Sequence, residues 1–237
     1  MEALKAEGVS RDFGGRTVLE NFSYTLPAGG FEALMGPSGS GKSTFLHLAA
    51  GLLSADSGEI FVGGRDVAKM RDGESARLRR RHVGVVFQAF NLLNEKTVAE
   101  NIALPLKLDG RKVDRARLDS LARLLGISAL LDRRAERLSG GEQQRVAIAR
   151  ALITSPDVIL ADEPTGNLDS VSSREICELL RQVNRAEKSA ILVVTHDPQV
   201  AAAAERVNFL KDGRIAASCA TQGDAALVSR KYLEIYG

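Results

Sequence analysis

The stretch GPSGSGKST, residues 36–44, lies between two apolar segments, FEALM and FLHLAAGLL. It fits the spacing G-x-x-x-x-G-K-[ST] at Gly36, Gly41, Lys42 and Ser43. Glycines let the backbone fold around an anion because no Cβ stands in the way, and their N–H groups then point inward. A helix that begins at Lys42 would add the positive end of its dipole at the same point. The stretch therefore predicts a phosphate-binding loop between a strand and a helix.

The loop offers several kinds of group to a nucleotide. Lys42 can reach the β- and γ-phosphates, and the Ser43 hydroxyl can bind Mg²⁺. A Gly/Ser-rich turn that precedes a lysine by chance is the simpler alternative, but the position between a strand and a helix favours phosphate binding. We predict nucleotide contacts from all nine residues of the loop: Gly36, Pro37, Ser38, Gly39, Ser40, Gly41, Lys42, Ser43 and Thr44.

Composition is that of an ordinary globular protein. The 237 residues are 44% apolar and 26% charged, with 32 basic and 30 acidic side chains and a formal charge of +2. This balance argues against a general nucleic-acid or membrane-surface binder, although local patches remain possible. We expect no nucleic-acid partner.

The cysteines and the N-terminus indicate a cellular compartment. Cys177 and Cys219 are far apart and lack metal-ligand spacing, so we expect reduced thiols. The N-terminal segment has acids where a signal peptide would be apolar, and no apolar run approaches the roughly 18 residues that span a bilayer. The sequence predicts a soluble, intracellular protein that would need a partner to work at a membrane.

The order of expected elements indicates the fold class. Strands are expected at 17–26, 31–35, 59–62, 83–87, 158–161 and 190–195, and helices at 42–53, up to 81, 173–187 and 197–205. Alternating helices and nearly continuous apolar strands favour a parallel sheet covered on both faces. Helical patterns from about 91 to 155, one of them interrupted by Pro105, predict an inserted helical subdomain.

Two acids follow the apolar strand expected at 158–161. Acids at the carboxyl end of a parallel strand lie at the crevice where such sheets bind ligands. Asp162 is therefore the candidate to hold Mg²⁺, and Glu163 the candidate general base for an attacking water. A solvated acidic loop is the alternative.

A second glycine-containing helix start occurs at LSGGE, residues 138–142. Ser139 is a good N-cap, and Gly140 and Gly141 leave the first backbone N–H groups accessible. A simple capping box, with Glu142 three residues after Ser139, is the alternative. Beside the other two motifs, this helix start suggests a second phosphate contact.

Together these motifs resemble those of the ATP-binding-cassette (ABC) ATPases over essentially the whole chain. GPSGSGKST is similar to Walker A, LSGGEQQRVAIARAL to the signature and VILADEP to Walker B. Gln88 in FQAF resembles the Q-loop, GNLDS at 166–170 the D-loop, and His196 in VVTHD the switch histidine. The resemblance implies a P-loop NTPase core with a mostly parallel sheet, an N-terminal antiparallel β subdomain and the helical subdomain at 91–155, all within one domain, 1–237.

The resemblance also implies a head-to-tail dimer of cassettes that holds two ATP molecules. Residues 139–141 would complete the γ-phosphate site of the partner subunit. His196 would contact the γ-phosphate, Gln88 would bind Mg²⁺ and sense the attacking water, and Asp169 would link the two sites. Phe13 would stack on adenine, with packing on the sheet as the alternative.

A transporter role follows from the same resemblance. We expect a cytoplasmic subunit, peripheral on the inner face of the cell membrane, that forms a homodimer and drives an integral membrane permease. Phe90, Leu92 and Leu93 of 87–106 would meet a short helix of that partner, and packing in the core of the helical subdomain is the alternative for each of them. Among the ABC ATPases, the sequence most resembles the cassettes that serve lipoprotein release, macrolide or peptide export and cell division.

A non-transport cassette, for chromosome maintenance, repair or translation, is the alternative function. Only about a hundred residues separate Lys42 from Ser139, without the heptads of a long coiled coil, and the chain has one cassette copy. A binding-only role is a third possibility, but Glu163 and His196 favour hydrolysis.

Some residues are expected to be structural or depart from the family pattern. His47 and His82 are expected to be ordinary polar residues, and 77–81 a solvated helix face. Gly30, Glu32 and Ala135 stand where the family commonly has glutamate, an apolar residue and proline. We expect Gly30 and Glu32 to affect the stability of the strand before the loop.

Overall fold

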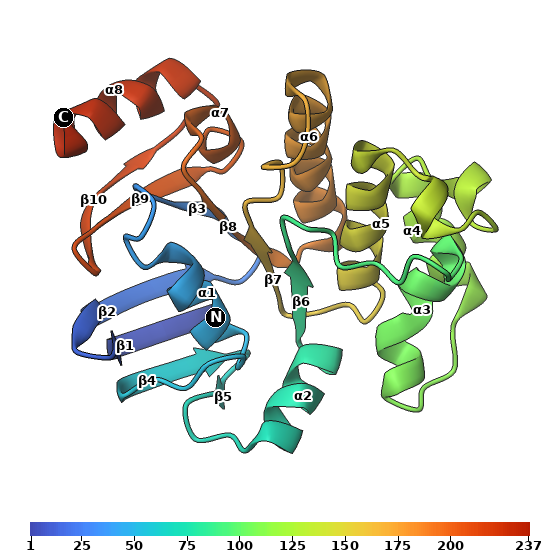
Figure 1. Ribbon diagram of the computed structural model, residues 1–237, viewed down its shortest axis with the longest axis horizontal. Helices are drawn as coiled ribbons and strands as arrows, with labels where there is room; N and C mark the ends of the chain where they lie inside the picture. The colour runs from blue at the N-terminus through green and yellow to red at the C-terminus, as the bar shows by residue number, and fades with distance from the viewer.

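The computed structural model describes residues 1–237 as two sheets and eight α-helices (Figure 1). The four-stranded sheet has the order β2-β1-β4-β5, and the six-stranded sheet β10-β9-β3-β8-β7-β6. The first sheet contains β1 (Glu2–Phe13), β2 (Arg16–Pro27), β4 (Ser57–Val62) and β5 (Arg65–Asp66). The second contains β3 (Phe31–Met35), β6 (Val83–Val86), β7 (Val158–Asp162), β8 (Ala190–Thr195), β9 (Arg206–Lys211) and β10 (Arg214–Ala220).

Strand pairing agrees with the expected fold class. The first sheet is antiparallel, whereas β6, β7, β8, β3 and β9 run parallel and only the β9–β10 hairpin is antiparallel. The expected α/β fold, with a mostly parallel sheet and an N-terminal antiparallel sheet, is confirmed. Because the carboxyl ends of β3, β7 and β8 lie on one edge, their following residues meet there.

Helices cover both faces of the larger sheet. They are α1 (Lys42–Ala49), α2 (Asp72–Arg81), α3 (Val98–Leu108), α4 (Arg115–Leu124), α5 (Gly140–Leu152), α6 (Ser170–Glu187), α7 (Pro198–Ala201) and α8 (Ala225–Tyr236). In Figure 1, α3, α4 and α5 lie together at one side, beyond β6. None of the helices combines the length and the apolar character that crossing a bilayer requires.

The core has two parts because successive strand residues face opposite sides. On β3, Phe31, Ala33 and Met35 pack with the helices of one face. Leu34 packs on the other face, with α1 and the antiparallel sheet. Strands buried on both faces need apolar residues at every position, which explains the runs FEALM and AILVVT.

Glu32 breaks this apolar run and is nevertheless accommodated. Its carboxylate is buried, and it accepts hydrogen bonds from the Tyr24 hydroxyl at 3.0 Å and the Asn208 side-chain N–H at 2.8 Å. Ser218 donates to Asn208 at 2.6 Å. The polar departure in β3 is therefore matched by polar partners on β2, β9 and β10, as a buried carboxylate requires.

Several boundaries differ from the sequence expectation. The helix expected to reach 53 ends at Ala49, because Gly51 has a φ of 61°, in the left-handed region that ends helices. The helix expected at 197–205 is only α7. Helix α3 continues through Pro105, which lies in its last turn, where a proline disrupts little of the remaining helix.

The arginines of α2 are less solvated than expected. The Arg80 and Arg81 side chains both pair with Asp109, the residue that ends α3, at 3.4 and 2.7 Å. Arg79 donates to the Gly51 carbonyl at 2.6 Å. The expected solvated face at 77–81 is found at Arg77 and Arg81, which are exposed, whereas Arg79 and Arg80 are half-buried. Three of these arginines join α2 to neighbouring segments.

Candidate functional site

The loop at 36–41 has the backbone of an anion-binding turn. Gly39 and Gly41 have φ values of 79° and 104°, in the region that L side chains rarely adopt. A Cβ on Gly36 would lie 2.5 Å from the Leu210 carbonyl oxygen. These glycines are therefore required by backbone geometry, and they turn the chain from β3 directly into the N-terminus of α1.

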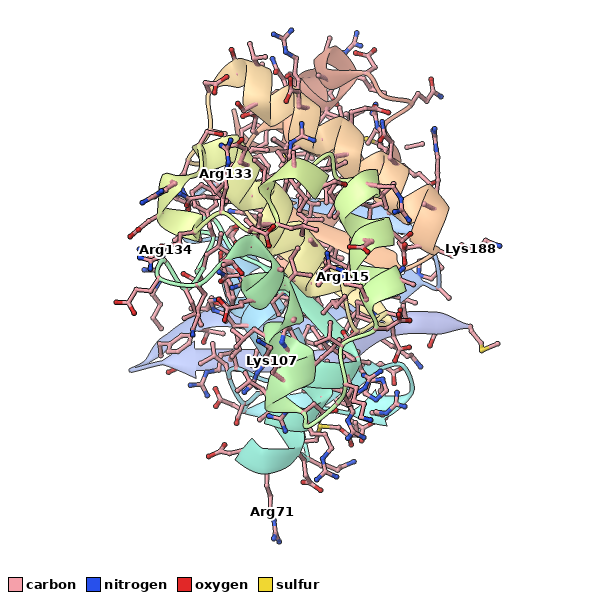
Figure 2. The ribbon with its side chains drawn as sticks, turned by 90° about the vertical axis from the view of Figure 1, so that its right-hand side faces the viewer. Arg71, Lys107, Arg115, Arg133, Arg134 and Lys188 are labelled. Carbon is pink, nitrogen blue, oxygen red and sulfur yellow. The ribbon has the colours of Figure 1, made fainter.

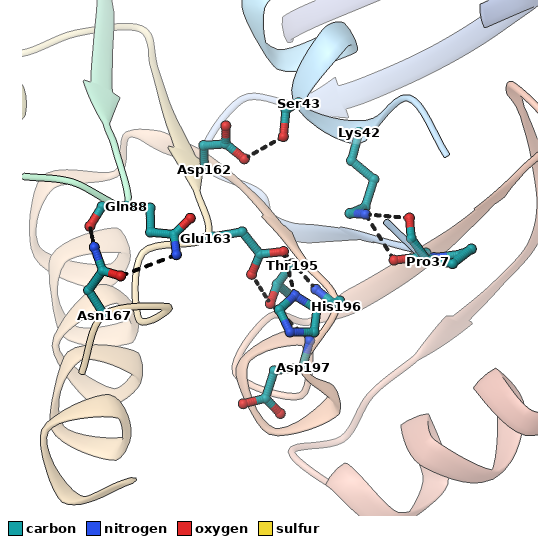
Figure 3. A network of polar contacts seen from close by, with 11 residues as sticks. Pro37, Lys42, Ser43, Gln88, Asp162, Glu163, Asn167, Thr195, His196 and Asp197 are labelled. Carbon is teal, nitrogen blue, oxygen red and sulfur yellow. Dashed lines mark hydrogen bonds and ion pairs between the residues drawn. The ribbon is translucent and has the colours of Figure 1, made fainter. Parts of the chain in front are cut away.

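Lys42 bridges the two ends of this loop. Its Nζ donates to the carbonyl oxygens of Gly36 and Pro37, both at 2.9 Å (Figure 3). Burial lowers the pKa of Lys42, whereas the nearby charges of Glu163 and Asp162 oppose that shift. The ammonium group therefore lies within the curve of the loop, with two acids on the opposite side.

The Ser40 hydroxyl provides independent evidence for an anion site in the loop. Its hydroxyl oxygen is buried and has no hydrogen-bond partner in the chain. Buried polar atoms are normally paired, so an unpaired hydroxyl in a loop of this geometry fits a bound anion. Together with the glycine backbone, this atom shows that the residues present suit a phosphate group.

Ser43 and Asp162 come together from segments 119 residues apart. The Ser43 hydroxyl donates to Asp162 Oδ1 at 2.9 Å, as Figure 3 shows. Burial raises the pKa of Asp162, and the Ser43 hydrogen bond opposes that shift. His47, one turn after Ser43 in α1, has Nε2 at 3.9 Å from Asp162 Oδ2.

The side-chain oxygens of Ser43 and Asp162 are of the kind that Mg²⁺ prefers as ligands. No group of three or more His, Cys, Asp or Glu side chains is arranged to hold a metal ion by itself. Mg²⁺ is commonly held by one or two protein oxygens, with phosphate and water completing the shell. The donor set therefore fits Mg²⁺ delivered with a nucleotide better than a resident metal ion.

Glu163 directly follows β7, and hydrogen bonds hold its carboxylate against the end of β8. Its Oε2 accepts from the Thr195 hydroxyl at 3.0 Å, and its Oε1 accepts from the backbone N–H of His196 at 3.1 Å. The same Oε1 lies 2.7 Å from Nδ1 of the His196 ring. Glu163 also has a φ of 45°, an uncommon conformation for a residue other than glycine. This arrangement fixes a carboxylate beside the imidazole.

Gln88 pairs with the segment that precedes α6. Its side-chain amide donates to Asn167 Oδ1 at 3.3 Å, and the Asn167 amide donates to the Gln88 carbonyl at 2.9 Å. No hydrogen bond joins Gln88 to Ser43 or Asp162. These two hydrogen bonds connect the segment that follows β6 to the 166–170 segment.

Residues 139–141 lie beside the 166–170 segment and α6. Ser139 accepts from the Glu142 N–H at 3.3 Å and Glu142 accepts from the Ser139 N–H at 2.8 Å, which is a complete capping box. An added Cβ on Gly140 would lie 3.2 Å from Leu168, and one on Gly141 3.4 Å from Ser172 Oγ. No hydrogen bond joins 139–141 to the loop at 36–44.

Asp169 caps α6 in the same way. Its carboxylate accepts from the N–H groups of Val171 and Ser172 and from the Ser172 hydroxyl. These hydrogen bonds lower the pKa of Asp169, the Ser172 backbone contact being the largest cause. Within one chain, Ser139 and Asp169 therefore act as helix caps.

Phe13 lies at the far end of the loop, at the tip of β1. It is 43% exposed, and the Arg11 guanidinium lies 4.6 Å from its ring centre. Phe13 lines a cavity of about 340 Å³ together with Lys42, Ser43 and Thr44. An exposed ring beside the loop is available for stacking, and it does not belong to the sheet core.

Three further residues of the site were not identified from the sequence. Asn167 positions Gln88, and Thr195 positions Glu163. Arg16 lines the cavity of Phe13 and Lys42. Asn167 lies inside the GNLDS segment, and Thr195 ends an apolar strand just before His196. Their positions within or beside the motifs could therefore have identified both residues from the sequence.

Comparisons with known proteins place this geometry in a family. A family model described as ABC transporter matches residues 19–166. The lipoprotein-releasing system ATP-binding protein LolD of Anaeromyxobacter dehalogenans is 46% identical over 90% of this chain and 92% of that protein. The macrolide export ATP-binding/permease protein MacB of Syntrophobacter fumaroxidans is 42% identical over 90% of this chain but only 30% of MacB.

A solved structure agrees over most of the fold. The dimeric ATP-binding cassette MJ0796, in a post-hydrolysis state bound to ADP and Pi, has a TM-score of 0.81 and 36% identity. The match covers 92% of this chain and 99% of the cassette. With the phosphate loop, the paired acids and the signature helix in the family order, the chain belongs to the ABC transporter family and is one of its ATPase cassettes.

Proposed function

We propose that two copies of the chain close head to tail around two ATP molecules. One observation carries this proposal: the signature helix start at 139–141 forms no hydrogen bond with the phosphate loop of its own chain, although both are glycine-rich helix N-termini suited to phosphate. A second chain would supply residues 139–141 to complete the γ-phosphate site. The dimeric cassette MJ0796 supports this arrangement.

Different residues of the chain would bind the phosphates, the metal ion and the adenine ring at each site. The N–H groups of 38–44 and the Lys42 ammonium would hold the β- and γ-phosphates. Ser43 and Asp162 would hold Mg²⁺, which supplies charge stabilisation at the phosphates when bound. Phe13 would stack on the adenine ring, and Gln88 would approach the metal and the attacking water.

Glu163 and His196 would carry the hydrolytic step. A water attacks the γ-phosphorus, the bond to the β-phosphate oxygen breaks, and the water proton passes to Glu163. ADP and inorganic phosphate leave. His196 would contact the γ-phosphate and hold the Glu163 carboxylate in place, and Asp169 would connect the two sites through the start of α6.

A groove beside the Q-loop is the proposed docking site for a membrane permease. It has a volume of about 420 Å³, and its apolar lining comes from Leu52, Phe87, Leu104, Pro105 and Leu108. Leu52 and Leu108 are 43% and 66% exposed, and both line this one groove, so it presents apolar surface to solvent. A short amphipathic helix of the permease would fit such a groove.

Only part of the segment expected to meet the permease lines this groove. Leu92 packs on the core, and the Phe90 ring lies against Gly140. The carbonyls of Phe90 and Asn91 both accept hydrogen bonds from Arg150. Leu93 is exposed, but it is not among the residues of the groove. Neither Phe90 nor Leu92 lines the groove, and Phe90 instead contacts the signature helix at Gly140 and Arg150.

The charge around the groove favours an acidic partner segment. Residues 71–155 contain 17 basic and 10 acidic side chains, whereas the rest of the chain contains 15 and 20. Arg79, Arg80 and Arg150 line the groove. Figure 2 shows Arg71 extending outward from the start of α2, and Lys107 on α3. Acidic side chains on the permease would complement this surface.

The relatives support a separate permease of the export or lipoprotein-release type. MacB is named as an ATP-binding and permease protein in one chain, whereas LolD is named as an ATP-binding protein of a releasing system. This chain matches LolD over nearly the full length of that protein and has no membrane-spanning helix. We therefore propose a peripheral subunit on the cytoplasmic face of the membrane.

Purification from detergent-solubilised membranes tests the permease proposal. The parent chain is expected to recover a membrane protein with several spans, and Leu108→Glu to lose it. Leu233→Glu is the matched control, because Leu233 is 67% exposed on α8, outside the groove. Equal recovery by both variants would contradict the groove as the docking site. Recovery of the parent chain without such a protein would contradict the permease proposal itself and favour a non-transport cassette.

A further inference from the structure

The last turn of α8 reaches the start of the phosphate loop. The Tyr236 hydroxyl donates to the Leu210 carbonyl oxygen at 2.8 Å and lies 3.4 Å from the Met35 carbonyl oxygen. Met35 is the last residue of β3, directly before Gly36. A Cβ on Gly36 would lie 3.3 Å from the Tyr236 hydroxyl. One side chain therefore contacts the ends of two neighbouring strands at the point where the loop begins.

Several contacts hold Tyr236 in this position. Val228 of the same helix is fully buried in the core, and Tyr232 packs on the Tyr236 ring with centres 4.5 Å apart. Lys211 donates to the Ile235 carbonyl at 2.8 Å and lies 5.9 Å from the Tyr236 ring centre. Burial raises the pKa of the Tyr236 hydroxyl above the ordinary tyrosine value, at which the group is already a neutral donor at physiological pH.

The Tyr236 contact is connected to Lys42 through two successive backbone carbonyls. Tyr236 touches the Met35 carbonyl, and the next carbonyl along the chain, that of Gly36, accepts from Lys42. Tyr236 also lines a cavity of about 500 Å³ together with residues 37–40 of the loop. It does not line the cavity of Phe13 and Lys42, so any effect on nucleotide must pass through the loop backbone.

We propose that Tyr236 is a positioning residue for nucleotide binding: its hydroxyl ties the C-terminal helix to β9 and to the end of β3, where the phosphate loop begins, and thereby keeps that loop in its binding conformation. Met35 and Leu210 are fully buried, so their carbonyls gain little from water if the hydroxyl is lost. A loop that must be ordered during binding holds phosphate less tightly than one ordered beforehand. The proposal rests on the loop being the ATP site.

Tyr236→Phe removes the hydroxyl alone, and Tyr232→Phe is the matched control because the Tyr232 hydroxyl has no hydrogen-bond partner in the chain. Tyr236→Phe is expected to raise KM for ATP and Kd for ADP by roughly threefold to tenfold, the worth of one hydrogen bond, with kcat nearly unchanged. Tyr232→Phe is expected to leave KM and Kd at parent values.

Three results decide the proposal. A parent-like KM and Kd in Tyr236→Phe would overturn it, as would an equal rise in Tyr232→Phe. A fall in kcat and melting temperature with an unchanged KM would also overturn it, because it would show a merely structural role. Lys42→Ala, measured alongside, distinguishes failure of the proposed ATP site from failure of the Tyr236 proposal. If Lys42→Ala loses affinity and Tyr236→Phe does not, the ATP site stands and only the role of Tyr236 fails.

Discussion

The Glu163 carboxylate lies 2.7 Å from Nδ1 of His196 and also accepts a hydrogen bond from the His196 backbone N–H. The pair holds a base candidate in one orientation before nucleotide arrives. Glu163→Gln keeps the shape but removes the proton acceptor, so we expect turnover to fall at least about a hundredfold while ATP still binds. Phosphate release and equilibrium binding of ATP measure the two effects separately.

Glu205→Gln is the control for that substitution, because Glu205 is an exposed glutamate without an ion pair. It should hydrolyse ATP at the parent rate. Hydrolysis by Glu163→Gln at the parent rate would show that another group accepts the proton.

Lys42→Ala is expected to weaken nucleotide binding itself. A charge-assisted hydrogen bond to phosphate is worth about 1.5–3 kcal/mol, so Kd should rise roughly ten- to a hundredfold by calorimetry. Lys112→Ala removes an exposed lysine that forms no ion pair and should leave Kd unchanged. An unchanged Kd in Lys42→Ala would remove the lysine from the phosphate site.

Glu32→Leu restores the apolar residue common in this strand and is nevertheless expected to destabilise the protein. It leaves the Tyr24 hydroxyl and the Asn208 amide without their buried acceptor, at about 1–3 kcal/mol for each group. Glu32→Gln keeps an acceptor oxygen and should lose less. Urea unfolding measures both, and a Glu32→Leu variant as stable as the parent would contradict this explanation.

Cys177 is expected to react slowly with alkylating reagents. Burial raises the pKa of its thiol to about 11, so the reactive thiolate is the minor form at pH 8. Because the thiolate fraction grows with pH below the pKa, alkylation should rise about tenfold per pH unit between pH 8 and 10. Peptide mass spectrometry follows the rate, with the urea-unfolded chain as the fast reference. A native rate that levels off below pH 10 would contradict the assignment.

The sequence predicted the parts of this molecule that depend on local pattern. The strands at 31–35 and 190–195 agree with the structure residue for residue, because continuous apolar runs between loop residues are distinctive. Strand β1 and the β9–β10 hairpin were not anticipated. Gly8 lies inside β1, where it weakens the strand pattern of the sequence, and β10 contains alanine and serine, which have little preference for strands.

Contacts between distant residues could not be predicted from one sequence. Gln88 meets Asn167 across 79 residues, and Tyr236 meets Met35 across 201. The partners of Glu32 lie on other strands, so the residue looked unfavourable when considered alone. The order of the strands in the sheet determines which distant residues come into contact, and that order is known only from the fold.

The most direct test of the composite site mixes two inactive variants. Lys42→Ala damages the phosphate loop, and Gly141→Asp places a carboxylate at the signature, where an added Cβ makes only an ordinary contact 3.4 Å from Ser172. If each site takes its loop from one chain and its signature from the other, a mixed dimer has one intact site. ATPase activity should then return on mixing, to at most about a quarter of the parent rate for random pairing. Mixtures that stay inactive at every ratio, although both variants are folded, would contradict a site shared between two chains.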